Sequence, residues 1–336
     1  MFKWSASIAA LSLGAALGFQ APAAQAQEIE TIIALPAPTL TFSAAFLAED
    51  AGFYKQAGLK VSHRMLVGVA AVNAVIAGSA DFTIGTGPVF LRAAANNQRL
   101  LTIANLIDKP LVEMVLRKDV AAAAGITEKS SFAEKTKALK GKTIAIQGVG
   151  SIIHAWERYV VARAGFDVET DVRIAPMDPP AMRPAMLNKA IDGFATSLPF
   201  TTEPVFKGDA IMLASAVTDA PELLPFAYGL VQTKPETCQQ NREKCVRVAK
   251  AYQLTAKFIH EKPDEALAIL AKRFPKMDQE LLKAAWQTVR AAHAKDLRVT
   301  VKSLENSENV NLVAKLLKPE DKLKSYDGLF TDEYLK

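Results

Sequence analysis

The sequence predicts an α/β fold of two lobes joined by two hinge strands, with a ligand cleft between the lobes. Short apolar segments alternate with helical segments along most of the chain, which is typical of parallel strands linked by right-handed crossovers. Two stretches, residues 81–88 (DFTIGTGP) and 143–154 (TIAIQGVGSIIH), each combine a strand, a small-residue turn and a helix start. Extended segments near 112–118 and 226–233 interrupt the alternation, which indicates that one lobe is inserted into the other.

The length and composition fit a globular protein of two domains. The chain has 336 residues, of which 50% are hydrophobic and 22% are charged, and this balance is typical of globular proteins with a substantial core. The formal net charge is +5. Because basic residues are interspersed with acidic ones rather than massed in blocks, the sequence does not indicate a nucleic-acid partner.

The first 26 residues have the pattern of a secretory signal peptide. Lys3 supplies a basic start, residues 6–19 are apolar, and the AQA sequence at 24–26 matches the small-residue cleavage motif. The apolar stretch is too short for a typical membrane span, and the alternative is a retained anchor. We expect cleavage near Ala26 and an exported chain that begins near Gln27. No cysteine near the cleavage point offers a lipid attachment site, and no later segment has 18 uninterrupted apolar residues.

Strands and helices of the first lobe alternate from residue 30 onward. Glycine and proline mark the helix ends: Gly52 and Gly78 follow helices, and Pro88 fits a first helical turn. The expected strands are 30–35, 59–66, 81–84 and 100–104, and the expected helices are 42–51, 70–77 and 89–96. The strand 112–117 (VEMVLR) then leaves this lobe.

The alternation restarts in the inserted lobe, after a polar connection at 118–131. Strands are expected at 142–147, 172–174, 191–195 and 210–214, with helices at 151–164, 179–190 and 199–206. A strand at 226–232 returns to the first lobe, where helices at 244–260, 263–273 and 278–294 have the apolar spacing of a packed layer. The expected division is 27–118 plus 227–336 for lobe 1, including the C-terminal helices, and 119–226 for the inserted lobe 2.

The two cysteines lie close together in a polar segment, PETCQQNREKC. In an exported protein this arrangement favours a disulfide between Cys238 and Cys245 that closes a small loop, and two free thiols are the alternative. A zinc site is not supported, because no histidine or second cysteine pair lies at ligand spacing. We therefore expect no metal.

The two small-residue turns are candidate sites for an anion or polar ligand, because a helix N-terminus presents free N–H groups and a positive dipole end. Ser151 is placed to cap its helix and to bind a ligand, or only to cap it. His154 lies one turn later and is either a ligand donor or an ordinary helix residue. The run GVGS does not match a dinucleotide fingerprint, because Ile153 stands where the third glycine is required.

Other polar and aromatic residues follow the predicted strands, where a ligand in the cleft is expected. Thr39 and Thr41 follow the first strand and either contact the ligand or cap the next helix. Thr86 lies in the first glycine turn and is the stronger candidate. Ser197, with Phe200 after it, ends a strand of the second lobe. The aromatic rings that we expect as apolar walls, unless they belong to the core, are Phe42, Phe200 and Tyr228.

The sequence supports no catalytic residue and no cofactor. It contains no G-x-S-x-G motif, no phosphate-binding loop and no cysteine–histidine arrangement in a plausible context. Asp178 and Glu203 are conceivable as a carboxylate pair, but nothing in the sequence brings them together. We therefore expect a protein that is not an enzyme.

Four stretches carry a resemblance to a known family. They are FLAEDAGFYKQAGLKV (46–61), AVIAGSADFTIGTGP (74–88), LKGKTIAIQGVGSIIH (139–154) and NKAIDGFATSLPF (188–200). In this order they resemble the periplasmic substrate-binding proteins of ABC importers, in the NMT1/THI5-like branch with alkanesulfonate (SsuA-like), taurine, nitrate and thiamine-pyrimidine-precursor binders. The resemblance implies a type II periplasmic binding protein fold over most of the chain.

The resemblance also implies ligand contacts on the turns. Matched to the family's pattern, the positions expected to contact ligand are Thr39, Thr41, Phe42, Thr86, Gly87, Gly150, Ser151, His154, Ser197 and Phe200. The GVGSIIH stretch keeps the Gly-Ser and His of sulfonate and nitrate binders. The TSLPF turn departs from the tryptophan-containing form of sulfonate binders, which puts a sulfonate ligand in doubt. The segment from Asp178 to Pro184 has no ligand interpretation.

The implied function is that of an extracytoplasmic solute-binding component. It would act as a periplasmic monomer that captures a small polar or anionic organic solute and delivers it to an inner-membrane ABC permease. Two alternatives stay open. One is an enzyme like the thiamine-pyrimidine synthases, whose cysteine-rich motif this chain lacks. The other is a periplasmic sensor subunit, which neighbouring genes would distinguish.

Overall fold

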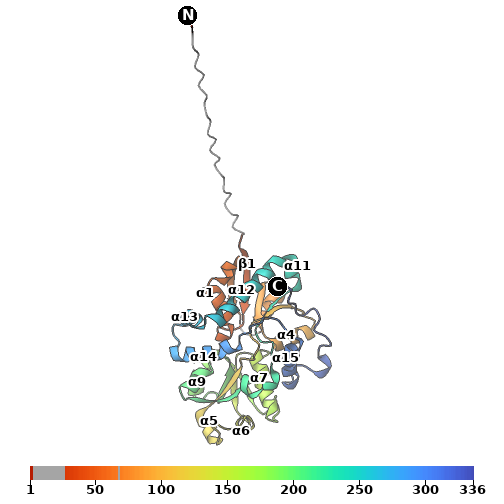
Figure 1. Cartoon of the computed structure of the whole chain (residues 1–336). Coiled ribbons are helices and arrows are strands. Elements are labelled where there is room, and N and C mark those ends of the chain that lie inside the picture. Colours follow the sequence, from red (N-terminus) through yellow and green to blue (C-terminus); the bar gives the residue numbers. More distant parts are fainter. Residues whose placement is uncertain (3–26, 67–68) are drawn as a thin grey trace.

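The computed structural model describes residues 1–2, 27–66 and 69–336, which contain two five-stranded sheets with helices packed on them (Figure 1). The predicted α/β fold class is confirmed. Most of the predicted signal peptide, residues 3–26, lies outside the described residues. In the described part of the chain, no helix has the length and apolar character needed to cross a lipid bilayer.

The first sheet has the strand order β2-β1-β3-β10-β4. Its strands are β1 Ile29–Leu35, β2 Leu59–Met65, β3 Phe82–Gly85, β4 Leu101–Asn105 and β10 Leu230–Thr233. The helices that accompany it are η1 Leu40–Phe42, α1 Ser43–Asp50, α2 Phe53–Gln56, α3 Ala70–Ile76 and α4 Gly87–Ala95. Strands β1, β2 and β3 are parallel, whereas β10 is antiparallel to both of its neighbours. We call this sheet and its helices the first lobe.

The second sheet has the order β7-β6-β8-β5-β9. Its strands are β5 Glu113–Arg117, β6 Thr143–Ile146, β7 Arg173–Pro176, β8 Gly193–Thr196 and β9 Ala210–Ser215. Its helices are α5 Lys118–Ala123, α6 Phe132–Lys137, α7 Ile152–Arg163, α8 Pro179–Leu187 and α9 Thr202–Phe206. The short helices α10 Ala216–Asp219 and η2 Pro221–Leu223 follow β9 on the return to the first sheet. We call this sheet and its helices the second lobe.

The expected hinge at 112–118 is corrected by the strand pairing. Strand β5 lies between β8 and β9 and is antiparallel to both, so it is a full member of the second sheet. Strand β10 belongs to the first sheet, so the expected crossing at 226–233 moves to about 216–229, and the outward crossing to about 106–112. Both sheets are therefore mixed rather than parallel, because each receives one strand directly from the other lobe. The polar connection expected at 118–131 contains helix α5, which its alanines favour.

The C-terminal third is helical, as expected, and adds two α-helices that the sequence did not predict, α11 in the cysteine segment and α15. Its elements are α11 Pro235–Gln240, α12 Arg242–Glu261, α13 Pro263–Arg273, α14 Gln279–Ala292, α15 Val301–Val313, η3 Pro319–Asp321 and η4 Glu333–Leu335. Helix α15 packs against α4 and α7, and so contacts both lobes (Figure 1). Its buried face is polar: the Asn306 amide donates to the Pro225 carbonyl at 2.9 Å, and the Asn311 amide donates to the Pro88 carbonyl at 2.9 Å.

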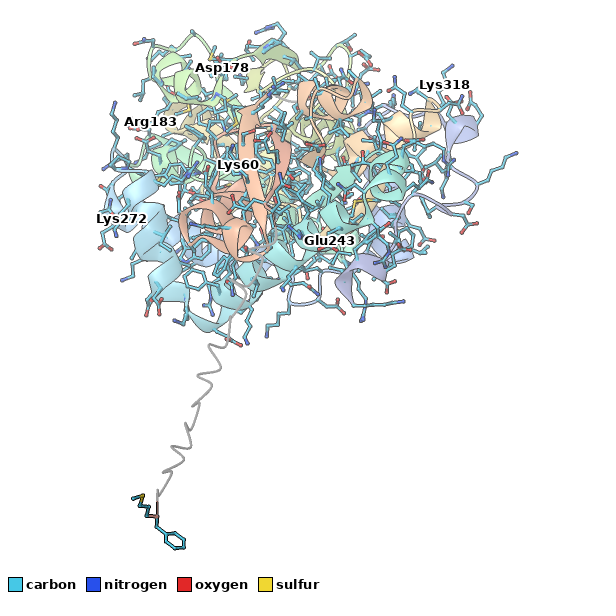
Figure 2. All side chains as sticks on the ribbon, turned by 90° about the horizontal axis from the view of Figure 1, so that it is seen from above. Lys60, Asp178, Arg183, Glu243, Lys272 and Lys318 are labelled. Atoms are coloured by element: carbon cyan, nitrogen blue, oxygen red, sulfur yellow. A yellow bond between two sulfur atoms is a disulfide. The ribbon has the colours of Figure 1, made fainter. Side chains whose placement is uncertain are left out.

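Charged side chains are spread over the surface rather than gathered on one face (Figure 2). The unexplained segment from Asp178 to Pro184 forms the start of α8, with Asp178 at the N-cap position but without a side-chain capping bond, and its Met182 packs with Met186 in the core beside the second sheet. Asp178 is exposed, and Arg183 forms an ion pair with Asp209 at 2.6 Å. The segment therefore has a structural role on the outside of the second lobe.

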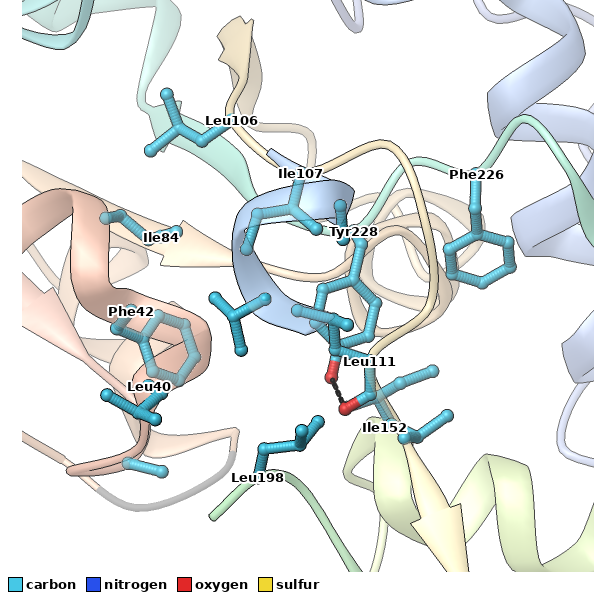
Figure 3. Packing of buried hydrophobic residues seen from close by; sticks show 14 of the residues in the cluster. Leu40, Phe42, Ile84, Leu106, Ile107, Leu111, Ile152, Leu198, Phe226 and Tyr228 are labelled. Carbon is cyan, nitrogen blue, oxygen red and sulfur yellow. Dashed lines mark hydrogen bonds between the residues drawn. The ribbon is translucent and has the colours of Figure 1, made fainter. Parts of the chain in front are cut away.

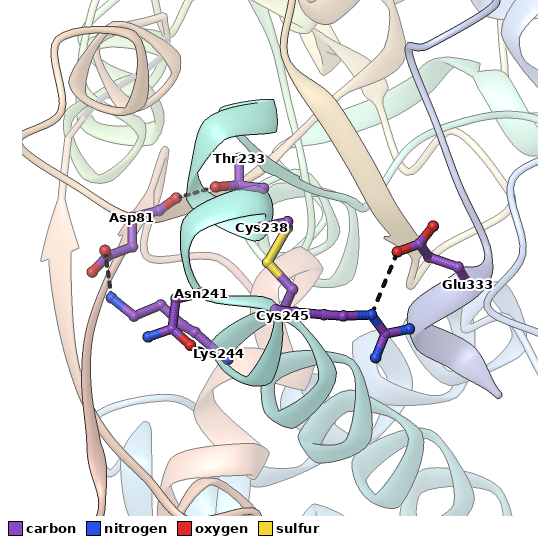
Figure 4. Close-up of a disulfide and its surroundings, with 8 residues drawn as sticks. Asp81, Thr233, Cys238, Asn241, Lys244, Cys245 and Glu333 are labelled. Carbon is purple, nitrogen blue, oxygen red and sulfur yellow. Dashed lines mark hydrogen bonds and ion pairs between the residues drawn. A yellow bond between two sulfur atoms is a disulfide. The ribbon is translucent and has the colours of Figure 1, made fainter.

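The predicted disulfide is confirmed. Cys238 in α11 and Cys245 in α12 are bonded and buried, and the bond holds the turn between the two helices (Figure 4). Beside it, the Lys244 ammonium pairs with the Asp81 carboxylate at 2.8 Å, and the Thr233 hydroxyl donates to the Asp81 carbonyl at 2.7 Å. The disulfide thus joins α11 to α12, and the Lys244–Asp81 pair holds α12 next to the start of β3 and the end of β10.

Replacing both cysteines by alanine is expected to lower the free energy of unfolding by about 2.5 kcal/mol, because the cross-link restricts a short loop in the unfolded chain. Urea unfolding of the wild type and of the Cys238→Ala, Cys245→Ala double variant measures this difference. A reductant should shift the wild type toward the double variant and leave the double variant unchanged. An unchanged midpoint on reduction of the wild type would contradict the prediction.

Candidate functional site

A pocket lies between the two lobes, at the carboxyl ends of β1, β3, β6 and β8. It contains about 560 Å³ of space not occupied by protein atoms. Residues of the first lobe and its crossing that line it are Pro36, Ala37, Thr39, Thr41, Phe42, Ala71, Val72, Thr83, Gly85, Thr86, Val89 and Tyr228. Residues of the second lobe that line it are Gln147, Ser151, Ile152, Ile153 and Ser197. This is the position at which open α/β sheets bind ligands.

Six of the ten candidate ligand residues line this pocket together. They are Thr39, Thr41, Phe42, Thr86, Ser151 and Ser197. The first four come from the first lobe and the last two from the second lobe, so the structure assembles them from four separate strand ends. The other four candidates, Gly87, Gly150, His154 and Phe200, are not among the lining residues.

Gly87 has a packing role at the start of α4. Its N–H donates to the carbonyl of Ala227 at 2.8 Å. A Cβ at this position would lie 2.6 Å from that carbonyl oxygen and 2.6 Å from the Ser307 side chain. Glycine therefore allows the return crossing and α15 to approach α4 closely.

Gly150 and His154 stabilise the turn before α7 through a hydrogen bond to each other, and neither lines the pocket. Gly150 has φ +81°, a conformation that favours glycine, and its N–H donates to Nδ1 of His154 at 3.1 Å. Burial, reinforced by the charges of Arg158 and Arg92, lowers the pKa of His154 to about 4. The imidazole is therefore neutral at physiological pH and acts as an acceptor for the turn.

Phe200 lies in a different groove. It lines a depression between α9 of the second lobe and the segment that joins α13 to α14, together with Lys207 and Phe274. The ring was predicted to contact ligand because Ser197 and Phe200 belong to one short turn. The bend at the end of β8 places Ser197 on the pocket and Phe200 beyond it.

Three threonine hydroxyls in the pocket lack a partner among the described residues. Thr39, Thr41 and Thr86 are only 1%, 3% and 6% exposed, and their hydroxyl oxygens make no hydrogen bond. Thr86 occupies the N-cap position of α4 without capping it. Because a buried polar group without a partner costs about 1–3 kcal/mol, three such groups around one pocket point to a bound ligand or ordered water.

Ser151 differs from the threonines because its hydroxyl is already engaged. It accepts from the His154 N–H at 3.2 Å and donates to the Gly148 carbonyl at 2.7 Å. The serine is thus the N-cap of α7, as the sequence analysis proposed for its structural role. It shapes the turn before α7. Ile152 and Ile153, in the first turn of α7 where N–H groups have no partner within the helix, line the pocket.

The pocket combines positive helix ends with an apolar wall. Helices α4 and α7 both begin at it, and their N-termini favour acceptor atoms or negative charge. Within the described part of the chain, no charged side chain lines it. Phe42, Ile152 and Tyr228 form part of the wall (Figure 3). Burial keeps the pKa of Tyr228 well above its usual value, and its protonated hydroxyl donates to the Leu111 carbonyl at 3.2 Å.

Several lining residues were not singled out in the sequence. Gln147 directly follows strand β6 and could have been found by the same rule that found Thr86 and Ser197. Val72 and Val89 lie on helices, where apolar residues have the same pattern whether they face a core or a pocket. No sequence signal distinguishes them.

Two arginines link the lobes beside the pocket. The Arg92 guanidinium, on α4, donates to the Gly150 carbonyl before α7 and to the Asn311 side chain on α15. The Arg158 guanidinium, on α7, donates to the Ala314 carbonyl at 2.6 Å. These contacts join the ligand-facing turn of the second lobe to helices that pack on the first.

Solved structures share this fold over almost the whole chain. A protein from Bordetella bronchiseptica RB50 superimposes with a TM-score of 0.76 at 20% identity, covering 91% of this chain and 96% of that one. The alkanesulfonate-binding protein SsuA from Xanthomonas axonopodis pv. citri, bound to MOPS, has a TM-score of 0.70 at 18% identity, with 89% and 97% covered. The periplasmic nitrate-binding protein NrtA from Synechocystis PCC 6803 has a TM-score of 0.61 at 14% identity, with 76% and 69% covered.

These structural similarities confirm the predicted periplasmic binding protein fold. A search of curated proteins found no match. A family model described as NMT1/THI5 like matches residues 40–266, which is more than half of the chain and includes both lobes. The protein therefore belongs to the NMT1/THI5-like family.

Proposed function

We propose that this protein is the periplasmic solute-binding component of an ABC importer, and that it captures a small polar or anionic organic solute and delivers it to an inner-membrane permease. The observation that carries the proposal is the pocket between the lobes, in which Thr39, Thr41 and Thr86 present buried hydroxyls that have no partner in the described part of the chain. The related folds of an alkanesulfonate-binding and a nitrate-binding protein support it. The signal peptide pattern supports export, and we propose that the exported chain acts as a monomer.

The mechanism is binding followed by lobe closure. The first lobe supplies the free threonine hydroxyls and the start of α4, and the second lobe supplies Ser197 and the start of α7. A solute that contacts both sets stabilises the closed arrangement more than the open one, which shifts the population toward closure. We propose that the crossings at 106–112 and 216–229 act as the hinges.

The enzyme alternative has less support from the site. Among the described residues that line the pocket there is no cysteine, histidine or carboxylate to act as nucleophile or general base. A binding protein needs only the donors and the apolar wall that are present.

Titration calorimetry with ethanesulfonate, nitrate and MOPS, combined with mass spectrometry of the compound that co-purifies, tests the proposal. We expect a compound to be retained and recovered unchanged, with a smaller radius of gyration by small-angle scattering in its presence. Recovery of a chemically altered product would favour the enzyme. If no compound is retained and none causes closure, the proposal fails.

Thr86→Val is expected to weaken binding of the retained compound by about 1–2 kcal/mol, which is about 5- to 30-fold in Kd. The substitution keeps the shape of the side chain and removes only the free hydroxyl. Thr255→Val is the matched control, because Thr255 is buried in α12 and donates to the Ala251 carbonyl, away from the pocket lining. Equal affinity of Thr86→Val and wild type would show that the first glycine turn is only structural.

A further inference from the structure

A row of buried polar side chains crosses the first sheet beside the pocket. In the strand register Gln232 of β10 lies opposite Thr83 of β3 and Thr102 of β4, so the three side chains share one face of the sheet. Gln232 and Thr102 are both 0% exposed. The amide nitrogen and oxygen of Gln232 and the hydroxyl of Thr102 have no hydrogen-bond partner among the described residues.

Gly85 connects this row to the pocket. Thr83 and Gly85 both line the pocket. On β3 they face the same side of the sheet as Gln232 does on the neighbouring strand β10. A Cβ built on Gly85 would stand 2.4 Å from the amide oxygen of Gln232 and 2.9 Å from its amide carbon. The carboxamide therefore lies directly against Gly85, in the space that any side chain at 85 would fill.

The unused hydrogen-bonding capacity is unusual for so deep a position. Buried amides normally have partners, and an orphaned one costs about 1–3 kcal/mol for each unsatisfied group. The Thr83 hydroxyl donates its proton to the Ala34 carbonyl at 3.0 Å, so it cannot donate to the amide oxygen of Gln232. Thr102, opposite Gln232 on β4, forms no hydrogen bond with it among the described residues. The side of Gly85, which lines the pocket, is the approach that the structure leaves for a partner.

We propose that Gln232, whose carboxamide lies behind the pocket-lining Gly85, is a specificity-determining residue, and that it recognises an uncharged amide-type group of the solute. A carboxamide presents a donor and an acceptor side by side, and it pairs best with a group that offers the complementary pair. An acceptor-only anion satisfies the amide nitrogen and leaves the amide oxygen without a donor. This inference rests on the proposed function and narrows the solute class to compact carboxamides or lactams with an apolar body.

Titration calorimetry compares primary amides from acetamide to benzamide with the carboxylates of the same skeletons, from acetate to benzoate. The wild type should bind at least one amide about tenfold more tightly than its carboxylate, and Gln232→Leu should remove that preference. The melting temperature of Gln232→Leu should stay the same or rise, because an apolar group replaces an unsatisfied amide. A purely structural role would instead lower the melting temperature and leave the preference intact, which would overturn the inference.

Two further variants keep the test decisive. Gln232→Met, which is unbranched like glutamine, replaces the leucine variant if that protein does not fold. Thr102→Val removes the other orphaned group in the row, which lies on β4, one strand further from the pocket-lining Gly85 than Gln232, and should leave the preference for amides unchanged. Tighter binding of carboxylates than of amides, or binding of only ethanesulfonate, nitrate or MOPS, overturns the inference and leaves the proposed function standing. If no compound of either set binds, both fail.

Discussion

Replacing Glu157 by glutamine should raise the free energy of unfolding at pH 8 by about 3 kcal/mol and flatten its dependence on pH between about 5 and 8. Glu157 lies on α7, is 1% exposed, and has one carboxyl oxygen without a partner among the described residues. Burial raises the pKa of Glu157 from 4.5 to about 7. The positive charge of Arg158 lowers this pKa in part, and the negative charge of Glu169 adds to the increase. The ionised form is therefore costly in the folded protein.

The direction of the pH effect follows from the protons bound in each state. Between pH 4.5 and 7 the unfolded chain releases the proton of Glu157 while the folded protein retains it, so the folded state binds more protons. Stability from this group is fully present below pH 4.5 and is lost as the pH rises through 7. The interval from 4.5 to 7 corresponds to about 3 kcal/mol.

Urea unfolding of the wild type and of Glu157→Gln at several pH values between 5 and 8 measures the effect. Glu320→Gln serves as control, because Glu320 is an exposed glutamate in η3. The control should follow the wild-type profile. Parallel pH profiles for Glu157→Gln and wild type would mean that the carboxylate finds a partner or water when it ionises.

The elements with local signals were predictable, and those that depend on long-range pairing were not. The start of α7 was found because Ser151 follows a small-residue turn and precedes an apolar helix, and its hydroxyl does cap that helix. The antiparallel positions of β5 and β10 were missed, because a short apolar run does not encode which sheet it joins. Helix α15 was missed because its buried face is polar and bonds to the return crossing, so no apolar stripe marks it.

The residues of the candidate site could be predicted where they directly follow a strand in the sequence. Thr39, Thr86 and Ser197 each come just after a strand, and the carboxyl ends of those strands converge on one pocket. Gly87 and His154 belong to the same turns but do not line the pocket, because Gly87 packs against Ala227 and Ser307 and the His154 ring accepts from the Gly150 N–H. The role proposed for Gln232 depends on its contact with Gly85 on the neighbouring strand, and no local sequence pattern reveals that contact.

The contacts of Arg92 suggest a second large effect, this time on binding. Arg92 is half-buried, and no carboxylate of the described residues pairs with its guanidinium. Burial lowers the pKa of Arg92 to about 10, so the group is still charged at neutral pH. Its bonds to the Gly150 carbonyl and to Asn311 join α4 of the first lobe to the turn before α7 and to α15. In the proposed mechanism the bond to the Gly150 carbonyl forms only when the lobes are closed, whereas Asn311 also bonds to Pro88 of α4 and stays beside Arg92.

Arg92→Met is therefore expected to weaken solute binding by about 2 kcal/mol, or about 30-fold in Kd, mainly through faster dissociation, because one hydrogen bond from a charged group contributes about 1.5–3 kcal/mol. Methionine keeps the apolar stem and removes the guanidinium. The melting temperature of the free protein should change little, since the loss of these bonds is offset by removing a buried charge without a carboxylate partner. Stopped-flow dissociation of the co-purified compound and thermal unfolding separate the two effects.

The control for this variant is Arg99→Met, which removes an arginine of the first lobe whose guanidinium, among the residues that the structure describes, bonds only to the exposed Asp327 carbonyl, at 2.7 Å. It should bind and release solute like the wild type. If Arg92→Met lowers the melting temperature and leaves the dissociation rate unchanged, Arg92 supports the fold and not closure. If the rate rises and the melting temperature holds, the bond between α4 and the turn before α7 is what retains the solute once the lobes have met.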